Sequence, residues 1–434
     1  LHRPDTPGRS SALRERASRQ KGISFSVRMG LNSGEVVVGT IGDDLRMDYT
    51  ALGYTASLAA RMQQIAEPGK AYLTEHTAKL VEGMFALQDV GRMAVKGVKA
   101  PLGVYELRGV GQLRTRLEVS RARGFSRFVG RSHEMASLQA ALAKAIGGKG
   151  QVVGVVADPG VGKSRLCLEF AALCRSRGIE VFEAHGVSHG KAIPFLPILE
   201  LFRGYFGITE QDSDQAAREK IAGRMLLLDE TLRDALAPTF EFLGVPDPGQ
   251  PAPRIDPDAR QRPLFAVVKR VVEAHSRREP VVTLIEDLHW FDHGSEAFLE
   301  VLVETTTTTR SLLILNFRPE YRAGWMQKSY YQQLPLQPLT AESVGEMLRD
   351  LLGTDPSLAA LAATIGDQTG GNPFFIEEMV PTLAKTEASS AREGAITSIV
   401  RSRIWRCRLR CRLFSPPAST ASGSATRMCC TRPQ

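Results

Sequence analysis

Hydrophobic periodicity in the first quarter of the chain predicts a compact α/β unit over residues 23–108. Apolar and polar residues alternate from 25 to 31, which is typical of a half-buried strand. Leu58, Met62 and Ile65 recur at helical spacing, and Pro68-Gly69 would end that helix. The expected elements are strands at 25–31, 35–38, 71–73 and 103–107 and helices at 55–66 and 74–80, the second capped by Thr74.

A second and larger α/β unit is predicted over residues 128–385. Continuous apolar runs at 151–156, 281–285 and 312–315 are typical of strands buried on both faces, as in a parallel sheet. A helix is expected at 164–176, a loop along the six prolines of 246–263, and a helix end at Thr305–Thr309. The fold class is therefore α/β, with a smaller unit before a parallel-sheet unit.

Three segments lie outside these units. Residues 1–22 are polar and Arg-rich, 109–127 carry five arginines and predict a linker, and 386–434 lose periodicity and acidic residues together. The length of 434 residues fits two to four domains. No apolar run approaches ~18 residues, so we expect no membrane span.

The net charge of +8 belongs to the end of the chain. Residues 395–434 hold eight arginines and no Lys, Asp or Glu, so the rest of the chain has 47 basic and 47 acidic residues. We therefore expect no nucleic-acid binding by the folded units. The abrupt change of composition suggests a frameshift near 396–400; the alternative is a basic arm for nucleic acid or an anionic membrane. Either tail should be disordered.

Cysteine usage predicts a reducing, cytoplasmic setting, because only Cys167 and Cys174 precede residue 400. The four cysteines of the tail lack zinc-ribbon spacing, so we expect no metal there. His185 and His189 stand four residues apart without an evident third ligand, and we expect structural roles for both. His289 is expected to pack or hydrogen-bond beside the acidic pair at 286–287.

A glycine-rich turn gives the strongest chemical signal. It reads ADPGVGKS from Ala157 to Ser164, between a predicted strand and a predicted helix. Gly160 and Gly162 would let backbone N–H groups curl around phosphate oxygens, and the start of the helix adds positive potential. Lys163 would reach the β- and γ-phosphates, and the Ser164 hydroxyl would bind Mg²⁺.

This turn resembles a P-loop, the Walker A pattern GxxxxGK[ST], with Ala157 at the place of the first glycine. The resemblance implies ATP as substrate and Mg²⁺ as cofactor. It also implies nucleotide contacts from Asp158, Pro159, Gly160, Val161, Gly162, Lys163, Ser164 and Arg165.

An acidic strand end follows later, in VVTLIEDLHW from Val281 to Trp290, and resembles Walker B. One carboxylate of such a pair enters the Mg²⁺ shell and the other polarises the attacking water. We assign Glu286 to the metal and Asp287 to the water, with the exchange of these roles open. Lys163, Glu286 and Asp287 are thus the candidate catalytic residues.

Three further segments resemble signalling AAA/STAND ATPases, in the order found in that group. FVGRSHE at 128–134 resembles the segment near the adenine, and NFRPE at 316–320 the sensor region, with Arg318 as its polar candidate. GGNPFFIEE at 370–378 resembles the helical lid, whose Pro373 would touch the base. The resemblance implies a P-loop ATPase with a lid over 128–379.

Residues 27–107 resemble the C-terminal half of a class III adenylate/guanylate cyclase domain, through VRMGLNSGEVVVG at 27–39, DYTALG at 48–53 and LAARM at 58–62. The implied fold is a truncated ferredoxin-like module. In the family pattern Thr50 takes the base-recognition position, Arg61 the transition-state arginine and Lys99 the triphosphate lysine, whereas Ser57 replaces a ribose-orienting Asn.

These departures predict a catalytically incomplete cyclase. The two metal-binding aspartates of the family belong to its N-terminal half, which we expect this chain to lack, and Asp43 and Asp44 match neither position. Without the metal ions the developing charge is not stabilised. Cyclic nucleotide would then form only with a complementing partner, since such sites form across a dimer interface.

Three functions follow from these patterns: an ATP-hydrolysing signal-transduction switch, a nucleotide-binding scaffold without turnover, and half of a cyclase site. Lys163, Glu286 and Asp287 favour the first over the second, and Ser57 counts against the third. Homo- or hetero-oligomers through either unit are the expected assemblies.

Overall fold

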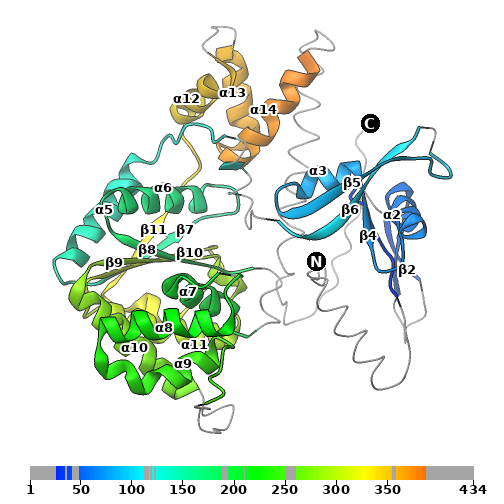
Figure 1. Ribbon diagram of the computed structural model, residues 1–434. Coiled ribbons are helices and arrows are strands. Elements are labelled where there is room, and N and C mark those ends of the chain that lie inside the picture. The colour runs from blue at the N-terminus through cyan, green and yellow to red at the C-terminus, as the bar shows by residue number, and fades with distance from the viewer. Residues whose placement is uncertain are drawn as a thin grey trace. The chain divides into compact units, whose positions relative to one another are not determined.

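The computed structural model describes residues 26–34, 37–41, 48–98, 100–111, 117, 120–121, 124–187, 194–209, 211–249, 261–353 and 358–387. The chain divides into two compact units, residues 1–125 and 126–434 (Figure 1). Asp43, Asp44, Lys99, His189 and the tail after 387 lie outside the described residues, so the expectations for them stay predictions.

The described part of the first unit contains a four-stranded sheet in the order β1-β4-β6-β5 and a separate pair, β2 and β3. Strands β1 and β4 are parallel, whereas β4, β6 and β5 are antiparallel neighbours. The elements are β1 (Met29–Leu31), β2 (Val37–Ile41), β3 (Asp48–Leu52), α2 (Tyr54–Ile65), β4 (Ala71–Thr74), α3 (Glu75–Val81), β5 (Phe85–Met93) and β6 (Leu102–Val110).

Helix α2 packs against β1 and β4 and forms the core of this unit. Met62 is fully buried beside Tyr72 and Val104. At Gly30 a Cβ atom would lie 2.1 Å from the Ala59 carbonyl oxygen, so only glycine lets α2 approach β1 this closely. The predicted cap is confirmed, because the Thr74 side chain accepts a hydrogen bond from the N–H of Thr77.

The described strands of the second unit form a wholly parallel sheet in the order β11-β7-β10-β9-β8 (Figure 1). All seven residues of β10 are buried, as the apolar run predicted. The strands are β7 (Gln151–Val156), β8 (Glu180–His185), β9 (Val281–Glu286), β10 (Ser311–Phe317) and β11 (Tyr331–Pro335).

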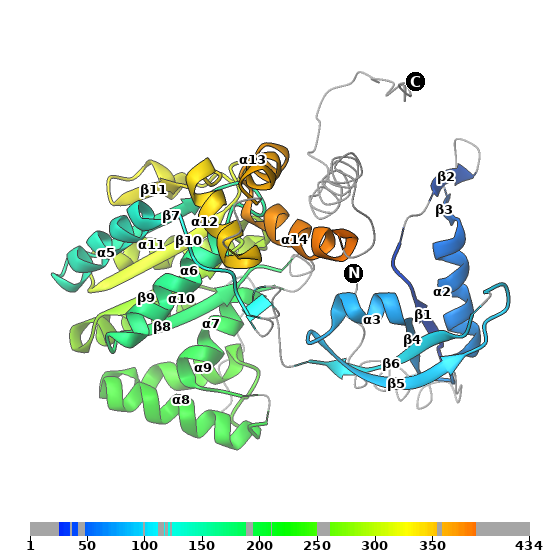
Figure 2. The same cartoon turned by 90° about the horizontal axis from the view of Figure 1, so that it is seen from above.

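Helices cover both faces of this sheet (Figures 1 and 2). One face carries α5 (Ser132–Ile146) and α6 (Lys163–Ser176). On the other side lie α7 (Leu196–Phe206), α8 (Asp214–Leu228), α9 (Leu236–Phe242), α10 (Gln261–Arg278) and α11 (His293–Thr306). Short 3₁₀ turns are η2 (Glu230–Ala235), η3 (Leu288–Trp290) and η4 (Gly324–Gln327).

Three helices follow the sheet and occupy the segment in which a lid was expected, so we refer to them as the lid: α12 (Ala341–Leu352), α13 (Leu358–Thr369) and α14 (Pro373–Glu387). They share a core of their own, in which Val344, Ile365 and Ile376 are buried. Val129, from the segment that leads into the unit, joins the same core.

Several sequence predictions need correction. Helix α10 begins at Gln261, so Pro263 lies in a first helical turn rather than in a loop; proline is tolerated there because its missing N–H has no helical partner. Strand β10 extends to Phe317, so Asn316 belongs to the strand. Strand β5 was not predicted, because register shifts at Ala86/Leu87 and Asp89/Gly91 break its alternation.

Candidate functional site

The phosphate loop connects β7 to α6 at the carboxyl edge of the parallel sheet. Gly160 and Gly162 have φ of 84° and 105°, which only glycine adopts without strain. Helix α6 begins at Lys163 and directs its positive end toward the loop. In open α/β sheets, ligands bind outside the carboxyl ends of the strands. They bind at the point where the connections from two neighbouring strands leave in opposite directions.

Lys163 lies folded over its own loop. Its side chain is buried, and Nζ donates to the Ala157 carbonyl at 2.6 Å and to the Asp158 carbonyl at 3.1 Å. Burial lowers the pKa of the ammonium, the Arg318 charge lowers it further, and the Asp287 charge opposes both. An ammonium held only by carbonyls can exchange them for phosphate oxygens, which bind it more strongly.

The two acidic residues follow one another at the end of β9. Glu286 is 8% exposed, and the side chains of His185, Ser164 and Asn316 oppose the effect of this burial on the pKa of its carboxyl. Burial raises the pKa of Glu286, and the neighbouring Asp287 charge adds to that effect. Burial also raises the pKa of Asp287, against the charges of Lys163 and Arg318. The sheet thus brings the three candidate catalytic residues to one edge.

Asn316 is a site residue that the motif patterns missed. It is fully buried, and its Oδ1 accepts the backbone N–H of Asp287 at 2.8 Å. Asp287 has φ of 56°, a left-handed conformation that Asn and Asp tolerate better than most residues. The available signal was an amide in the apolar run LLILNF of β10. Asn316 therefore holds the acidic turn against the neighbouring strand.

Arg318 follows β10 and lies near the acidic turn. The centre of its guanidinium is 5.8 Å from the centroid of the Trp290 ring. Its charge lowers the pKa of Lys163 and of Asp287, so all three groups sense one another electrostatically. His289 Nδ1 lies 3.9 Å from Asp287 Oδ1, as expected for a histidine beside the acidic pair.

The leading segment and the lid both contact the phosphate loop. Arg131 is buried and donates to the Val161 carbonyl at 2.9 Å. From the lid, Asn372 Nδ2 donates to the Pro159 carbonyl at 3.1 Å. The N–H of Phe374 donates to the Gly160 carbonyl at 3.3 Å. Pro373, the first residue of α14, is half-buried between these two contacts.

Replacing Gly160 with Ala should weaken ATP binding by about tenfold or more, a cost of ~1.4 kcal/mol. A Cβ there would lie 2.7 Å from Asn372 Oδ1 and 3.0 Å from Phe374 Cβ. Gly178→Ala is the matched control, because Gly178 also has positive φ but nothing within 4 Å of its Cβ. Titration with a fluorescent ATP analogue checks this; equal affinities of the two variants would contradict it.

The side chain of Arg165 is engaged beside the loop. Its Nε donates to Glu169 at 2.8 Å, and a terminal nitrogen donates to the Ser126 carbonyl at 3.1 Å. Of the predicted loop contacts, Asp158, Pro159 and Val161 lie in the turn itself. The nucleotide contacts of these residues remain predictions.

His185 ends β8 and lies opposite Glu286 in the sheet register. Its Nδ1 is 3.1 Å from Glu200 Oε1, and its backbone N–H donates to the same carboxylate at 3.0 Å. Burial lowers the pKa of His185, but the hydrogen bond and charge of Glu200, with Glu286 and Glu183, outweigh it and raise the pKa to about 9.

Stability should therefore depend on pH through His185. Because its folded pKa exceeds the unfolded value of about 6.5, the imidazolium contributes fully below that pH and is lost as pH rises through about 9. Thermal unfolding should show the wild type losing more stability over this window than Glu200→Gln, which lacks the main partner. Parallel curves for the two proteins would contradict this.

The cyclase-like residues lie on α2 and β3. Ser57 and Arg61 both belong to α2; Ser57 is exposed and Arg61 half-buried. Thr50 is in β3, paired with Gly39 of β2. Tyr54, at the start of α2, is 63% exposed. Ser57 and Arg61 stand four positions apart, so they share one side of the helix.

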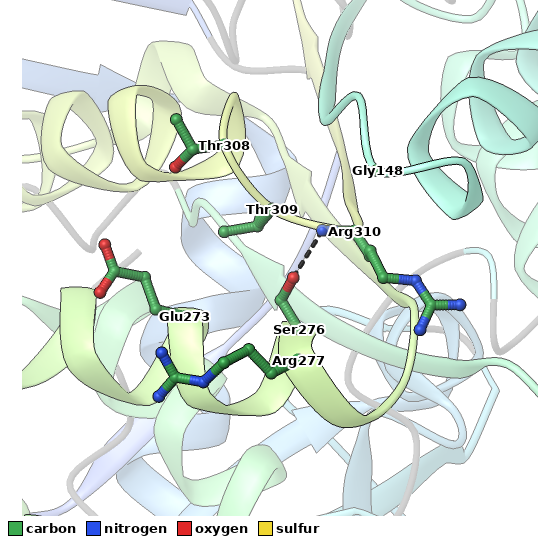
Figure 3. Close-up of a pocket in the computed structure, with 7 residues that line it drawn as sticks. All are labelled: Gly148, Glu273, Ser276, Arg277, Thr308, Thr309 and Arg310. Atoms are coloured by element: carbon green, nitrogen blue, oxygen red, sulfur yellow. Dashed lines mark hydrogen bonds between the residues drawn. The ribbon is translucent and has the colours of Figure 1, made fainter.

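A shallow hollow of about 320 Å³ lies at the opposite edge of the parallel sheet (Figure 3). It is lined by residues that precede β7, β9 and β10, including Gly148, Ser276 and Arg310. The side chains of Arg277 and Arg310 point in different directions in Figure 3. We place the candidate site at the phosphate loop rather than at this hollow, because Lys163, Glu286 and Asp287 come together at the loop.

Two protein families match the chain. A family of adenylate and guanylate cyclase catalytic domains matches residues 10–109, and a family of AAA ATPase domains matches residues 127–315. The chain therefore joins a cyclase-type domain to an AAA ATPase domain. Our expectation of only the C-terminal half of the cyclase domain was wrong, since the match already begins at residue 10; the polar residues before 23 carry no periodicity that would have shown it.

Two curated relatives match the chain over very different lengths. An uncharacterised protein of Rhizobium meliloti is 26% identical over 372 residues, 81% of this chain and 35% of its own length. Adenylate cyclase 1 of the same organism is 30% identical over 97 residues, 22% of this chain and 15% of its own. The chain thus spans about a third or less of these two relatives.

Among solved structures, the adenylyl cyclase CyaB from P. aeruginosa is 32% identical over 23% of this chain and 52% of its own, with a TM-score of 0.22. A signal transduction ATPase with numerous domains (STAND) and a tetratricopeptide repeat sensor from Pyrococcus horikoshii is 15% identical over 63% of this chain and 33% of its own, with a TM-score of 0.34.

The donor atoms present fit Mg²⁺. The Ser164 hydroxyl and the Glu286 carboxylate are both oxygen donors of the kind this ion prefers, and Ser164 lowers the pKa of Glu286. When bound, the ion would neutralise charge on the phosphates. Among the helices that the structure describes, none is long and apolar enough to cross a membrane.

Proposed function

We propose that the second unit binds and hydrolyses ATP as a switch in signal transduction. One observation supports this most directly: the Glu286 carboxyl is buried at the end of β9, where Ser164 of the phosphate loop and Asp287 both act on its pKa, and the Asp287 charge in turn acts on Lys163. A scaffold that only binds nucleotide would need the loop and Lys163 but not a buried carboxylate with a second, partly exposed carboxylate next to it. Burying Glu286 is costly, and catalysis would explain its retention.

In this proposal each residue has one task. Backbone N–H groups of 160–164 surround the phosphates, and Lys163 exchanges the carbonyls of Ala157 and Asp158 for β- and γ-phosphate oxygens. Ser164 and Glu286 hold Mg²⁺. Asp287, whose side chain is 41% exposed, orients and polarises the attacking water.

Arg318 would neutralise charge that develops on the γ-phosphate as its bond to ADP breaks. The lid would touch the base through Pro373, and its contacts with Pro159 and Gly160 would then depend on the nucleotide. Hydrolysis to ADP and phosphate resets those contacts, which makes the unit a switch.

We further propose that the cyclase-type domain is catalytically incomplete in this chain, because Ser57 stands where the family has a ribose-orienting Asn. Serine is too short to reach as far as that amide. The alternative is cyclic nucleotide synthesis with a complementing partner, through Thr50, Arg61 and Lys99. Oligomers through either unit would serve both ATP hydrolysis and cyclic nucleotide synthesis.

The free thiols of Cys167 and Cys174 support a reducing, cytoplasmic compartment.

Phosphate release from ATP tests the hydrolysis proposal. The purified chain should release phosphate with Mg²⁺ and stop when EDTA removes the ion, because the γ-phosphate charge is then unneutralised. ATP binding without phosphate release under any Mg²⁺ concentration would contradict hydrolysis and support the scaffold.

A further inference from the structure

The residues that lead into the second unit are held by the lid. The Ser126 hydroxyl donates to the Glu377 carboxylate of α14. The backbone N–H of Arg127 donates to Asp350 Oδ2 at 2.7 Å, near the end of α12. The Arg127 guanidinium also lies 3.2 Å from Glu346 Oε1. Hydrogen bonds to carboxylates are stronger than neutral ones, so two lid helices fix the backbone here.

The same residues are tied to the phosphate loop from the other side. Arg165 follows Ser164 directly and donates to the Ser126 carbonyl at 3.1 Å. Its guanidinium centre is also 5.8 Å from the centroid of the Phe128 ring. The start of α6 is therefore in direct contact with the leading segment.

These contacts close a circuit. From the phosphate loop it passes through Arg165 to Ser126, and from Ser126 to Glu377 on α14. Helix α14 then returns to the loop, where Asn372 donates to the Pro159 carbonyl. Because α12, α13 and α14 share one core, a lid movement that breaks the Asn372 contact must also move the carboxylates that hold 126–127.

We propose that residues 126–128 form a nucleotide-responsive latch. In one nucleotide state Glu377 and Asp350 of the lid hold this segment through their hydrogen bonds. In the other nucleotide state these hydrogen bonds are broken and the segment is released. The segment is the covalent route from the ATPase domain to the cyclase-type domain, so the latch passes the state of the ATP site to the chain before it. This inference rests on the proposed function, because it needs a lid that responds to ATP and ADP.

Hydrogen exchange followed by mass spectrometry tests the latch on the full chain, without nucleotide, with Mg²⁺ and ADP, and with Mg²⁺ and ATPγS. The Arg127 amide exchanges only when its bond to Asp350 opens. We expect exchange within 124–131 to differ by about tenfold or more between two of these states, as for a bond population that shifts with ligand.

The decisive variant is the double substitution Asp350→Ala with Glu377→Ala. Exchange at 124–131 should become fast in every state and vary by less than about twofold, while amides of 158–164 still respond to nucleotide. Asp367→Ala removes an exposed carboxylate from α13 and should keep the wild-type response. Ser126→Ala is a milder change that serves if the double variant fails to fold. It should lose part of the nucleotide response at 124–131.

The outcomes separate the two proposals. If neither 158–164 nor 124–131 responds to nucleotide in the wild type, the ATP site itself is wrong and the latch falls with it. If 158–164 responds and 124–131 does not, the ATP site stands and the latch is overturned. A double variant that keeps the wild-type response at 124–131 also overturns the latch.

Discussion

Glu286→Gln is expected to lower the rate of ATP hydrolysis by about a hundredfold or more while ATP affinity changes by less than about tenfold. The amide keeps the shape of the side chain but loses the charge that would hold Mg²⁺. Single-turnover hydrolysis measures the rate, and titration with a fluorescent ATP analogue measures the affinity.

Glu183→Gln is the matched control. Glu183 lies on the neighbouring strand β8 and pairs with Arg175 at 2.9 Å, away from the phosphate loop. It should hydrolyse ATP at close to the wild-type rate. An equal loss of rate in both variants would show that Glu286 acts through general stability rather than through catalysis.

Lys163→Ala is expected to weaken ATP binding by about 10- to 100-fold and to abolish measurable hydrolysis. A hydrogen bond to a charged group is worth about 1.5–3 kcal/mol, and tenfold in affinity corresponds to about 1.4 kcal/mol. The loss should fall on the triphosphate, so AMP affinity should change little. Titrations with ATP and AMP measure this difference.

Lys163→Ala should also change the stability of the protein. Burial lowers the pKa of Lys163, because desolvating its ammonium costs free energy in the folded state. The alanine variant avoids this cost, so its loss of stability should be smaller than the full value of the two hydrogen bonds that it lacks. Lys149 is an exposed lysine before β7, so Lys149→Ala is the control for the ATP titration. Weakened ATP binding in Lys149→Ala would point to net charge instead of a specific contact.

Buried strands and their chemistry could be predicted from the sequence because both leave a local signal. The run at 151–156 matches β7 residue for residue, and the glycine-rich turn follows it. The acidic pair comes at the end of β9 for the same reason: strand, turn and charge are adjacent in the chain. Parallel pairing then brings these strand ends together, which the apolar runs also implied.

What could not be predicted depends on pairing between distant residues. Asn316 is one polar residue in an apolar strand, and only the register of β10 beside β9 shows that it holds Asp287. His185 acquires its raised pKa from Glu200, which a separate helix supplies. The lid contacts of Ser126 and Arg127 span more than 200 residues, so no local pattern could announce them.

The identity of the product made from α-labelled ATP tests the central claim most directly. The chain is incubated with Mg²⁺ and the products are separated, with Lys163→Ala alongside. We predict labelled ADP from the wild type, none from Lys163→Ala, and no cyclic AMP from either. Labelled cyclic AMP would contradict an incomplete cyclase-type domain, and ADP formation that survives in Lys163→Ala would contradict the ATPase site.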